Sequence, residues 1–189
     1  YREHGTNCIY ITVNPCIKSS KSVLELIGSK LNVSSGSVSR LWLEISSKLS
    51  DGMVIIVDEA QHLTRNAIDT LRSLCDCFDE KGQTLGICFV GNETTVSRLG
   101  GKQKAEFAQI RNRTKNTRFY SVKQIKKSDI EMLFPDIRED TAAVEFLLCI
   151  AQSPQAIRGA VNLYSNALDN GNVTAKGLSA IAKYMDMAV

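Results

Sequence analysis

The sequence predicts an α/β fold with a parallel β-sheet, followed by a small all-helical domain. In the first two thirds of the chain, short β-rich runs alternate with segments whose apolar residues recur at helical spacing. From residue 126 onward only the helical spacing continues. A parallel sheet with crossover helices and a separate helical bundle explain this order. We therefore expect two domains, residues 1–125 and 126–189.

Four strands are expected, each a run of apolar or β-branched residues that ends at polar or turn residues. They are Cys8–Val13, Met53–Val57, Thr84–Val90 and Thr117–Val122. The second run, MVIIV, contains no polar residue, which is typical of a strand buried on both faces of a parallel sheet. Helices are expected over residues 20–31, 41–49, 66–78, 128–134, 141–151, 154–168 and 174–187.

Composition excludes several classes of protein. The chain has 189 residues, 43% of them hydrophobic, which is enough for one core domain and a small appendage. It contains no apolar run of membrane-spanning length and no signal peptide, so we expect a cytoplasmic protein with no membrane partner. The chain begins at Tyr1 rather than at a methionine, and we expect it to be a fragment that lacks its own N-terminus.

The six cysteines form no CxxC pair and have no histidine at zinc spacing. We expect buried free thiols rather than a metal site or disulfides.

Charge is concentrated in one part of the chain. Residues 98–127 contain ten basic residues and one acid, so this segment carries +9, whereas the chain as a whole carries +3. Such a block suggests a polyanionic partner, nucleotide or nucleic acid, and a solvated basic surface is the alternative that the charge count leaves open. Arg98, Lys102 and Lys104 flank a Gly-Gly pair, and we expect them to contact DNA phosphates without sequence specificity.

Two adjacent carboxylates follow the second strand. Because ligands bind at the carboxyl edge of a parallel sheet, Asp58 and Glu59 are placed where a substrate would lie. Asp58 can hold Mg²⁺ through its water shell, and Glu59 can orient a water for phosphoryl transfer. A helix-capping role is the alternative, but a cap needs only one acid.

Asn92 ends the third strand and would lie beside Asp58 if that strand neighbours the second. Phosphoryl transfer also requires cations where negative charge develops, and Arg111, Arg113 and Arg118 are candidates.

The order of these motifs resembles that of the AAA+ ATPases, and more closely the transposition-helper ATPases of transposable phages. The resemblance is densest in GMVIIVDEAQHL, LGICFVGNETTVSRLGGKQKAEFAQIRNRT and QIKKSDI, and it continues more weakly through SPQAIRGAVNLYSNAL. It implies an ATPase that uses ATP and Mg²⁺, assembles into filaments on double-stranded DNA, delivers that DNA to a transposase in the bacterial host cytoplasm, and dissolves the filament by hydrolysis.

The resemblance also implies residue roles. Asp58 and Glu59 match the Walker B pair, and Asn92 matches sensor 1. Arg113 is the first arginine-finger candidate and Arg111 the second. Arg158 matches the sensor 2 arginine of the helical lid.

One family motif is absent from the sequence. No Gly-rich loop ending in Lys-Ser/Thr precedes the Cys8–Val13 strand, so the phosphate-binding Walker A segment and its strand are missing. We expect this fragment not to hydrolyse ATP by itself. Two other interpretations stay open: an AAA+ protein of the loader or secretion type, and a non-hydrolysing interaction module.

Overall fold

The computed structural model describes residues 7–95 and 114–187. The chain divides into two compact units, Tyr1–Lys115 and Asn116–Val189. Within the described residues, the first contains a three-stranded parallel sheet with helices, and the regular elements of the second are all helical. The predicted α/β class followed by a helical domain is confirmed.

The described part of the first unit holds three strands in sequence order, β1-β2-β3, with β2 in the centre. Cys8 pairs with Val54 and Thr12 with Asp58, while Met53 pairs with Leu85 and Val57 with Phe89. The elements are β1 (Cys8–Thr12), α1 (Ser20–Lys30), α2 (Val38–Lys48), β2 (Met53–Asp58), the 3₁₀ turn η2 (Ala60–His62), α3 (Arg65–Asp79) and β3 (Leu85–Phe89).

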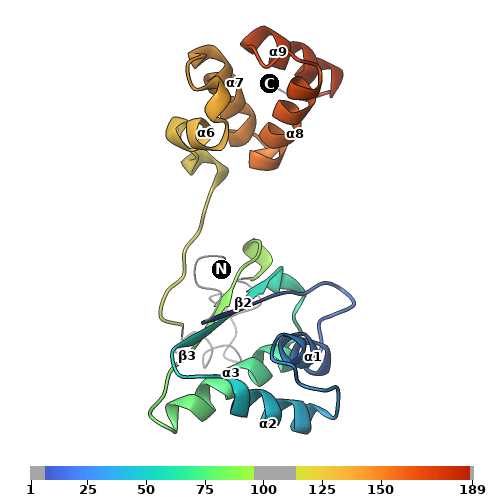
Figure 1. Cartoon of the computed structure of the whole chain (residues 1–189), viewed down its shortest axis with the longest axis vertical. Helices are drawn as coiled ribbons and strands as arrows, with labels where there is room; N and C mark the ends of the chain where they lie inside the picture. The colour runs from blue at the N-terminus through green and yellow to red at the C-terminus, as the bar shows by residue number, and fades with distance from the viewer. Residues whose placement is uncertain (1–6, 96–113, 188–189) are drawn as a thin grey trace. The chain divides into compact units, whose positions relative to one another are not determined.

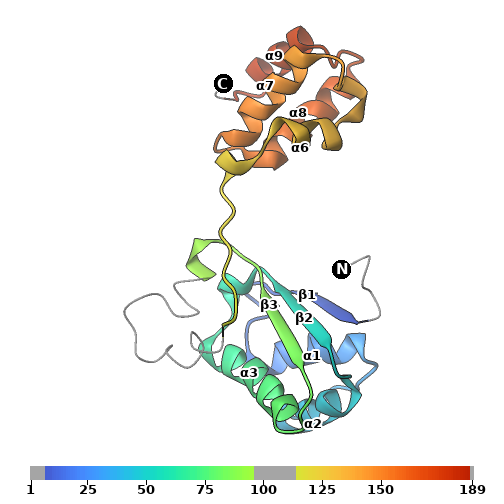
Figure 2. The same ribbon diagram turned by 90° about the vertical axis from the view of Figure 1, so that its left-hand side faces the viewer.

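Helices α1, α2 and α3 all lie on one face of this sheet (Figures 1 and 2). Successive right-handed crossovers that advance in one direction across a sheet place their connections on the same face. Ile55 and Val57 of β2 point to that face and are fully buried, whereas Val54 and Ile56 are half-buried. The prediction that β2 is buried on both faces is therefore confirmed for one face only, within the described residues.

Side-chain caps fix where the helices begin. Ser19 and Ser22 form a reciprocal capping box at α1, and Ser37 accepts a hydrogen bond from the backbone of Arg40 at α2. Thr64 caps α3 and also donates to the carbonyl of Lys18, which joins the start of α3 to the segment before α1. These caps satisfy backbone N–H groups that have no partner within the helix.

The second unit has a separate apolar core, centred on fully buried residues such as Ile130, Leu147 and Leu163. Its elements are η4 (Val122–Gln124), α6 (Lys127–Leu133), η5 (Pro135–Ile137), α7 (Thr141–Gln152), α8 (Ala156–Asp169) and α9 (Ala175–Tyr184). Gln152 donates to the carbonyl of Ile125 over 2.8 Å, which ties η4 to this unit. The domain boundary between residues 125 and 126 stays a prediction.

The predicted strand Thr117–Val122 is wrong. Residues 114–121 have no regular secondary structure, and Val122 begins η4. A strand requires a hydrogen-bonded neighbour, and within the described residues the sheet ends at β3. Phe119 and Tyr120 are 62% and 82% exposed instead of packing on a sheet.

All six cysteines lie in the described parts of the chain and none is in a disulfide, but the expectation that they are buried is wrong: Cys16, Cys88 and Cys149 are exposed and the others are half-buried. In the parts of the chain that the structure describes, no group of three or more His, Cys, Asp or Glu residues could hold a metal ion. No helix within those parts is both long and apolar enough to cross a membrane.

Candidate nucleotide site

The candidate site lies at the carboxyl edge of the sheet, where β2 ends at Asp58. Three backbone hydrogen bonds join the strand ends at this edge: Val13 donates to the carbonyl of Asp58 over 3.1 Å, Val90 to Val57 over 2.9 Å, and Ala60 to Val90 over 2.9 Å. The segments that follow all three strands are therefore held against one another, and ligands bind at such an edge in open α/β sheets.

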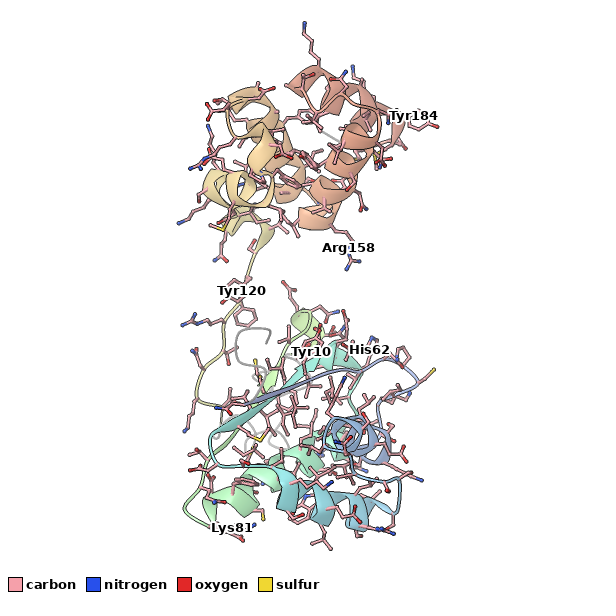
Figure 3. The ribbon with its side chains drawn as sticks, viewed as in Figure 1. Tyr10, His62, Lys81, Tyr120, Arg158 and Tyr184 are labelled. Carbon is pink, nitrogen blue, oxygen red and sulfur yellow. The ribbon has the colours of Figure 1, made fainter. Side chains whose placement is uncertain are left out.

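Both carboxylate oxygens of Asp58 accept hydrogen bonds. Oδ1 accepts from the backbone N–H of Glu59 at 2.9 Å, and Oδ2 accepts from the hydroxyl of Tyr10 on β1. The hydrogen bond to Asp58 is the main reason why the pKa of Tyr10 is raised above 10.0. Figure 3 labels Tyr10, which a sequence pattern could not connect to Asp58 because 48 residues separate them.

Glu59 follows directly, in the left-handed region of backbone space with φ 57°. A residue other than glycine adopts this conformation only where the surroundings hold it there. The turn at Glu59 ends β2, and its side chain is exposed at the edge of the sheet. The sequence predicted Glu59 as the residue beside Asp58 that orients water; the structure places the two residues together, and the role stays a prediction.

Gln61 is a site residue that the sequence did not reveal. Its Nε2 donates to Glu59 Oε2 over 2.5 Å, and its Oε1 accepts from the backbone N–H of Asn92 and from the hydroxyl of Thr95, both at 3.4 Å. The glutamine belongs to the DEAQ string, but only the pairing of β2 with β3 brings residues 92 and 95 within its reach.

Asn92 lies just beyond β3, beside the end of β2, as the sequence predicted. Its Oδ1 accepts from the backbone N–H of Thr94 at 3.0 Å and from the Thr94 hydroxyl. The carboxamide oxygen therefore caps the helical turn that begins at residue 93. An oxygen held in this way leaves the Nδ2 group as the part of Asn92 that can donate to a phosphate or a water.

The remaining predicted residues belong to the second unit or lie outside the described residues. Arg158 is exposed on α8 in the second unit, and its side chain points into solvent (Figure 3). Arg111 and Arg113, and the candidate DNA contacts Arg98, Lys102 and Lys104, lie outside the described residues. Arg118 is exposed in the segment that precedes η4.

The chemistry of the edge fits a hydrated Mg²⁺ ion. Magnesium prefers oxygen ligands and keeps several of its waters, so one or two carboxylates suffice to hold it. Asp58 supplies such a carboxylate, and its orientation is set by Tyr10 and by the Glu59 backbone.

Comparison with known proteins identifies the family. Residues 2–99, just over half of the chain, match the AAA domain family. The chain belongs to the AAA domain family. Membership implies nucleotide binding together with a divalent metal, in agreement with the oxygen ligands at the sheet edge.

Relatives of this AAA domain protein match nearly its whole length. It is 28% identical over 185 residues to the ATP-dependent target DNA activator B of Escherichia phage Mu, covering 94% of this chain and 55% of that protein. It is also 28% identical over 175 residues to the Mu-like prophage FluMu DNA transposition protein B of Haemophilus influenzae, covering 87% of this chain and 58% of that protein. The AAA domain protein thus spans just over half the length of these relatives.

Among solved structures, the AAA domain protein is similar to the RuvB Holliday junction branch migration motor of Thermotoga maritima. The TM-score is 0.52 with 17% sequence identity, over 93% of this chain and 61% of that one. A single-substitution variant of the same motor gives a TM-score of 0.54 at 18% identity. At such identities the likeness shows the fold alone, and it agrees with the P-loop NTPase-type sheet predicted from the sequence.

Proposed function

We propose that the complete protein is an ATP-dependent DNA-binding ATPase of phage or prophage DNA transposition. ATP-bound copies polymerise on target DNA, deliver it to the transposase and stimulate strand transfer, and hydrolysis then disassembles the polymer. The similarity to target DNA activator B carries this proposal, because it extends over 94% of the chain and includes both units.

Each residue at the sheet edge would have a separate role in hydrolysis. Asp58 would hold Mg²⁺ through its water shell, and a bound Mg²⁺ would neutralise charge on the phosphates. Glu59 would accept a hydrogen bond from the attacking water and orient it in line with the terminal phosphate. The Asn92 Nδ2 group would donate to that phosphate or water. The Walker A segment is expected from the rest of the complete protein.

Arginines would complete the site. Arg113 is the first candidate for a finger that reaches the nucleotide of a neighbouring copy, and Arg111 is the second. Arg158 would contact nucleotide from the helical unit. An arginine that is supplied by a neighbour makes hydrolysis depend on assembly, which suits a protein whose polymer is dissolved by hydrolysis.

DNA would be held through its backbone. Arg98, Lys102 and Lys104 belong to the segment that carries +9, and cations that contact phosphates give affinity without sequence preference. The protein would act in the cytoplasm of the bacterial host, where target DNA and transposase are both present.

Co-sedimentation with double-stranded DNA tests the proposal. The complete protein should sediment with DNA of any sequence in the presence of ATP and Mg²⁺, and much less without nucleotide. Glu59→Gln keeps the size of the side chain but removes the carboxylate, and it should lower ATP turnover by about a hundredfold or more while DNA binding persists. The proposal is overturned if the complete protein binds DNA equally with and without ATP, or if it does not hydrolyse ATP.

A further inference from the structure

The Gln61 side chain bridges the ends of two strands and has no part in the mechanism proposed for hydrolysis. We infer that Gln61 is a positioning residue for Glu59: it fixes the carboxylate that orients the attacking water to the turn after β3. This inference rests on the ATPase function proposed for the same site.

The first argument is the direction of the hydrogen bonds. Gln61 donates from Nε2 to Glu59 Oε2, and it accepts at Oε1 from the backbone of Asn92 and the hydroxyl of Thr95. The N–H and O–H groups that point at Oε1 determine which end of the carboxamide faces Glu59. The amide end is therefore committed to the carboxylate, and a hydrogen bond to an ionised acceptor is among the stronger ones.

The second argument is the rigidity of what Gln61 is anchored to. Thr95 is only 4% exposed, so the far end of the bridge is buried. The backbone N–H of Ala60 donates to the carbonyl of Val90, which keeps the two chain segments together. Glu59 itself is exposed and has a long side chain with several rotamers, so its backbone alone would not fix its carboxylate.

The third argument is the space left for the bridge at Gly91. A Cβ atom at this position would overlap both Gln61 Oε1 and Thr95 Oγ1, and it would lie 3.3 Å from the backbone nitrogen of Ala60. The glycine thus makes room for the Gln61 side chain to pass the end of β3. Glycine at position 91 is therefore needed for packing, as well as for the turn between β3 and Asn92.

Because Gln61 holds the Glu59 carboxylate in one position, the bridge should affect the rate of hydrolysis. General-base catalysis needs the acceptor within hydrogen-bonding distance of the water, and a displacement of about 1 Å can cost about a hundredfold in rate. Loss of the bridge should therefore lower kcat. It should leave the KM for ATP nearly unchanged, because Glu59 does not contribute to holding the nucleotide.

Steady-state kinetics of the complete protein test the inference. Gln61→Ala removes both ends of the bridge, and Gln61→Glu keeps an acceptor but loses the donor and places a second negative charge beside Glu59. We expect kcat to fall by about tenfold to a hundredfold in Q61A and further in Q61E, with the KM for ATP within about twofold of the wild type. Gln83→Ala is the matched control, because Gln83 is exposed in the loop before β3.

Gly91→Ala tests the same bridge without changing Gln61. The atoms that the new methyl group meets first are the ends of two side chains, Gln61 and Thr95, so the chain can fold by moving them. We expect G91A to lower kcat as Q61A does, and the double variant to be little worse than either single one, because both remove one interaction.

Hydrogen exchange of the 189-residue chain gives a readout that does not depend on turnover. The Asn92 amide donates to Gln61 Oε1 and should exchange faster in Q61A, whereas the Ala60 amide, which donates to the Val90 carbonyl, should keep its wild-type rate. Unchanged exchange at Asn92 would show that the bridge does not form and would overturn the inference.

The kinetic outcomes separate the inference from the proposed function. If the wild-type protein hydrolyses ATP and Q61A retains its kcat, or loses affinity for ATP instead, only the positioning role is overturned. The same holds if Q83A loses as much activity as Q61A. A wild-type protein without ATP turnover overturns the proposed function and, with it, the role of Gln61.

Discussion

The Tyr10 hydroxyl donates a hydrogen bond to Oδ2 of Asp58, so a residue of the edge strand β1 holds the last residue of the central strand. The Glu59 backbone holds the other carboxylate oxygen, Oδ1. Each acid of the pair therefore has its own side-chain partner: Asp58 has Tyr10, and Glu59 has Gln61.

Tyr10→Phe removes this hydroxyl alone. A hydrogen bond to a charged acceptor contributes roughly 1.5–3 kcal/mol when shielded, and partial exposure reduces this, so we expect a loss of about 1 kcal/mol in the free energy of unfolding. Urea denaturation measures it. Tyr184→Phe is the matched control, since Tyr184 is 91% exposed, and it should change stability by less than about 0.5 kcal/mol. Equal losses in the two variants would contradict the role of the bond.

The hydrogen bonds that Asp51 accepts predict that the stability of the fold depends on pH. Its Oδ1 accepts from the backbone N–H of Thr84 at 2.7 Å and from the Thr84 hydroxyl at 3.0 Å. The backbone N–H is the larger cause and the hydroxyl the second, and they hold the pKa of Asp51 below its ordinary value of 3.8. A lowered pKa stabilises the fold at pH values above that ordinary value, and this stabilisation is lost as the pH falls through the folded pKa.

Asp51→Ala should therefore be less stable than the wild type at neutral pH, and the difference should shrink as the pH falls below about 4. Thr84→Val removes the hydroxyl but retains the backbone donor, so it should preserve most of the acid dependence. Urea titrations at a series of pH values measure both effects. If the D51A difference stayed constant across the series, the bond would not be what lowers the pKa.

Mixing two inactive variants tests whether Arg113 acts on a neighbouring copy. Arg113→Ala should lower ATP turnover by about a thousandfold, because an arginine finger contributes that much or more. Glu59→Gln should lower it by about a hundredfold or more, because it removes the carboxylate that orients the water. A mixture of the two should regain part of the turnover, since some interfaces then join an intact Glu59 to an intact Arg113. A mixture that stays as inactive as its components, together with recovery in the same experiment with Arg111→Ala, would assign the finger to Arg111.

Reversing the charge of Lys102 and Lys104 together tests the DNA-binding role of the basic segment that contains them. Affinity should fall on every DNA sequence, and the slope of log K against log salt should become shallower by about two, because two lysines no longer neutralise a phosphate. The control reverses Lys176 and Lys183, which are exposed on α9 and change the net charge equally. Equal affinities and equal salt slopes in the two double variants would show that Lys102 and Lys104 do not bind DNA.

Sequence periodicity predicted the regular elements because each depends on local spacing. The apolar runs indicated β1, β2 and β3, and the i, i+3, i+4 pattern indicated α3 and α7. The expected adjacency of Asp58 and Asn92 also followed, since it needed only the pairing of two parallel strands.

Residues whose roles depend on distant partners escaped this reasoning. Tyr10 meets Asp58 across 48 positions, and Gln61 meets Thr95 across 34, and no periodic pattern records such contacts. At Thr117–Val122, by contrast, the sequence predicted a strand that the structure does not contain. Its β-branched and aromatic residues favour a strand, but a strand also needs a partner, and the described residues provide none.

The exposed thiols can be used as labelling sites for fluorophores. Cys88 lies on β3 in the first unit and Cys149 on α7 in the second, and both are accessible to maleimide dyes. With Cys16 replaced by serine, a donor and an acceptor fluorophore at these two native positions would report how far apart the units are in single molecules. Energy transfer recorded with and without nucleotide would then follow the helical unit in real time.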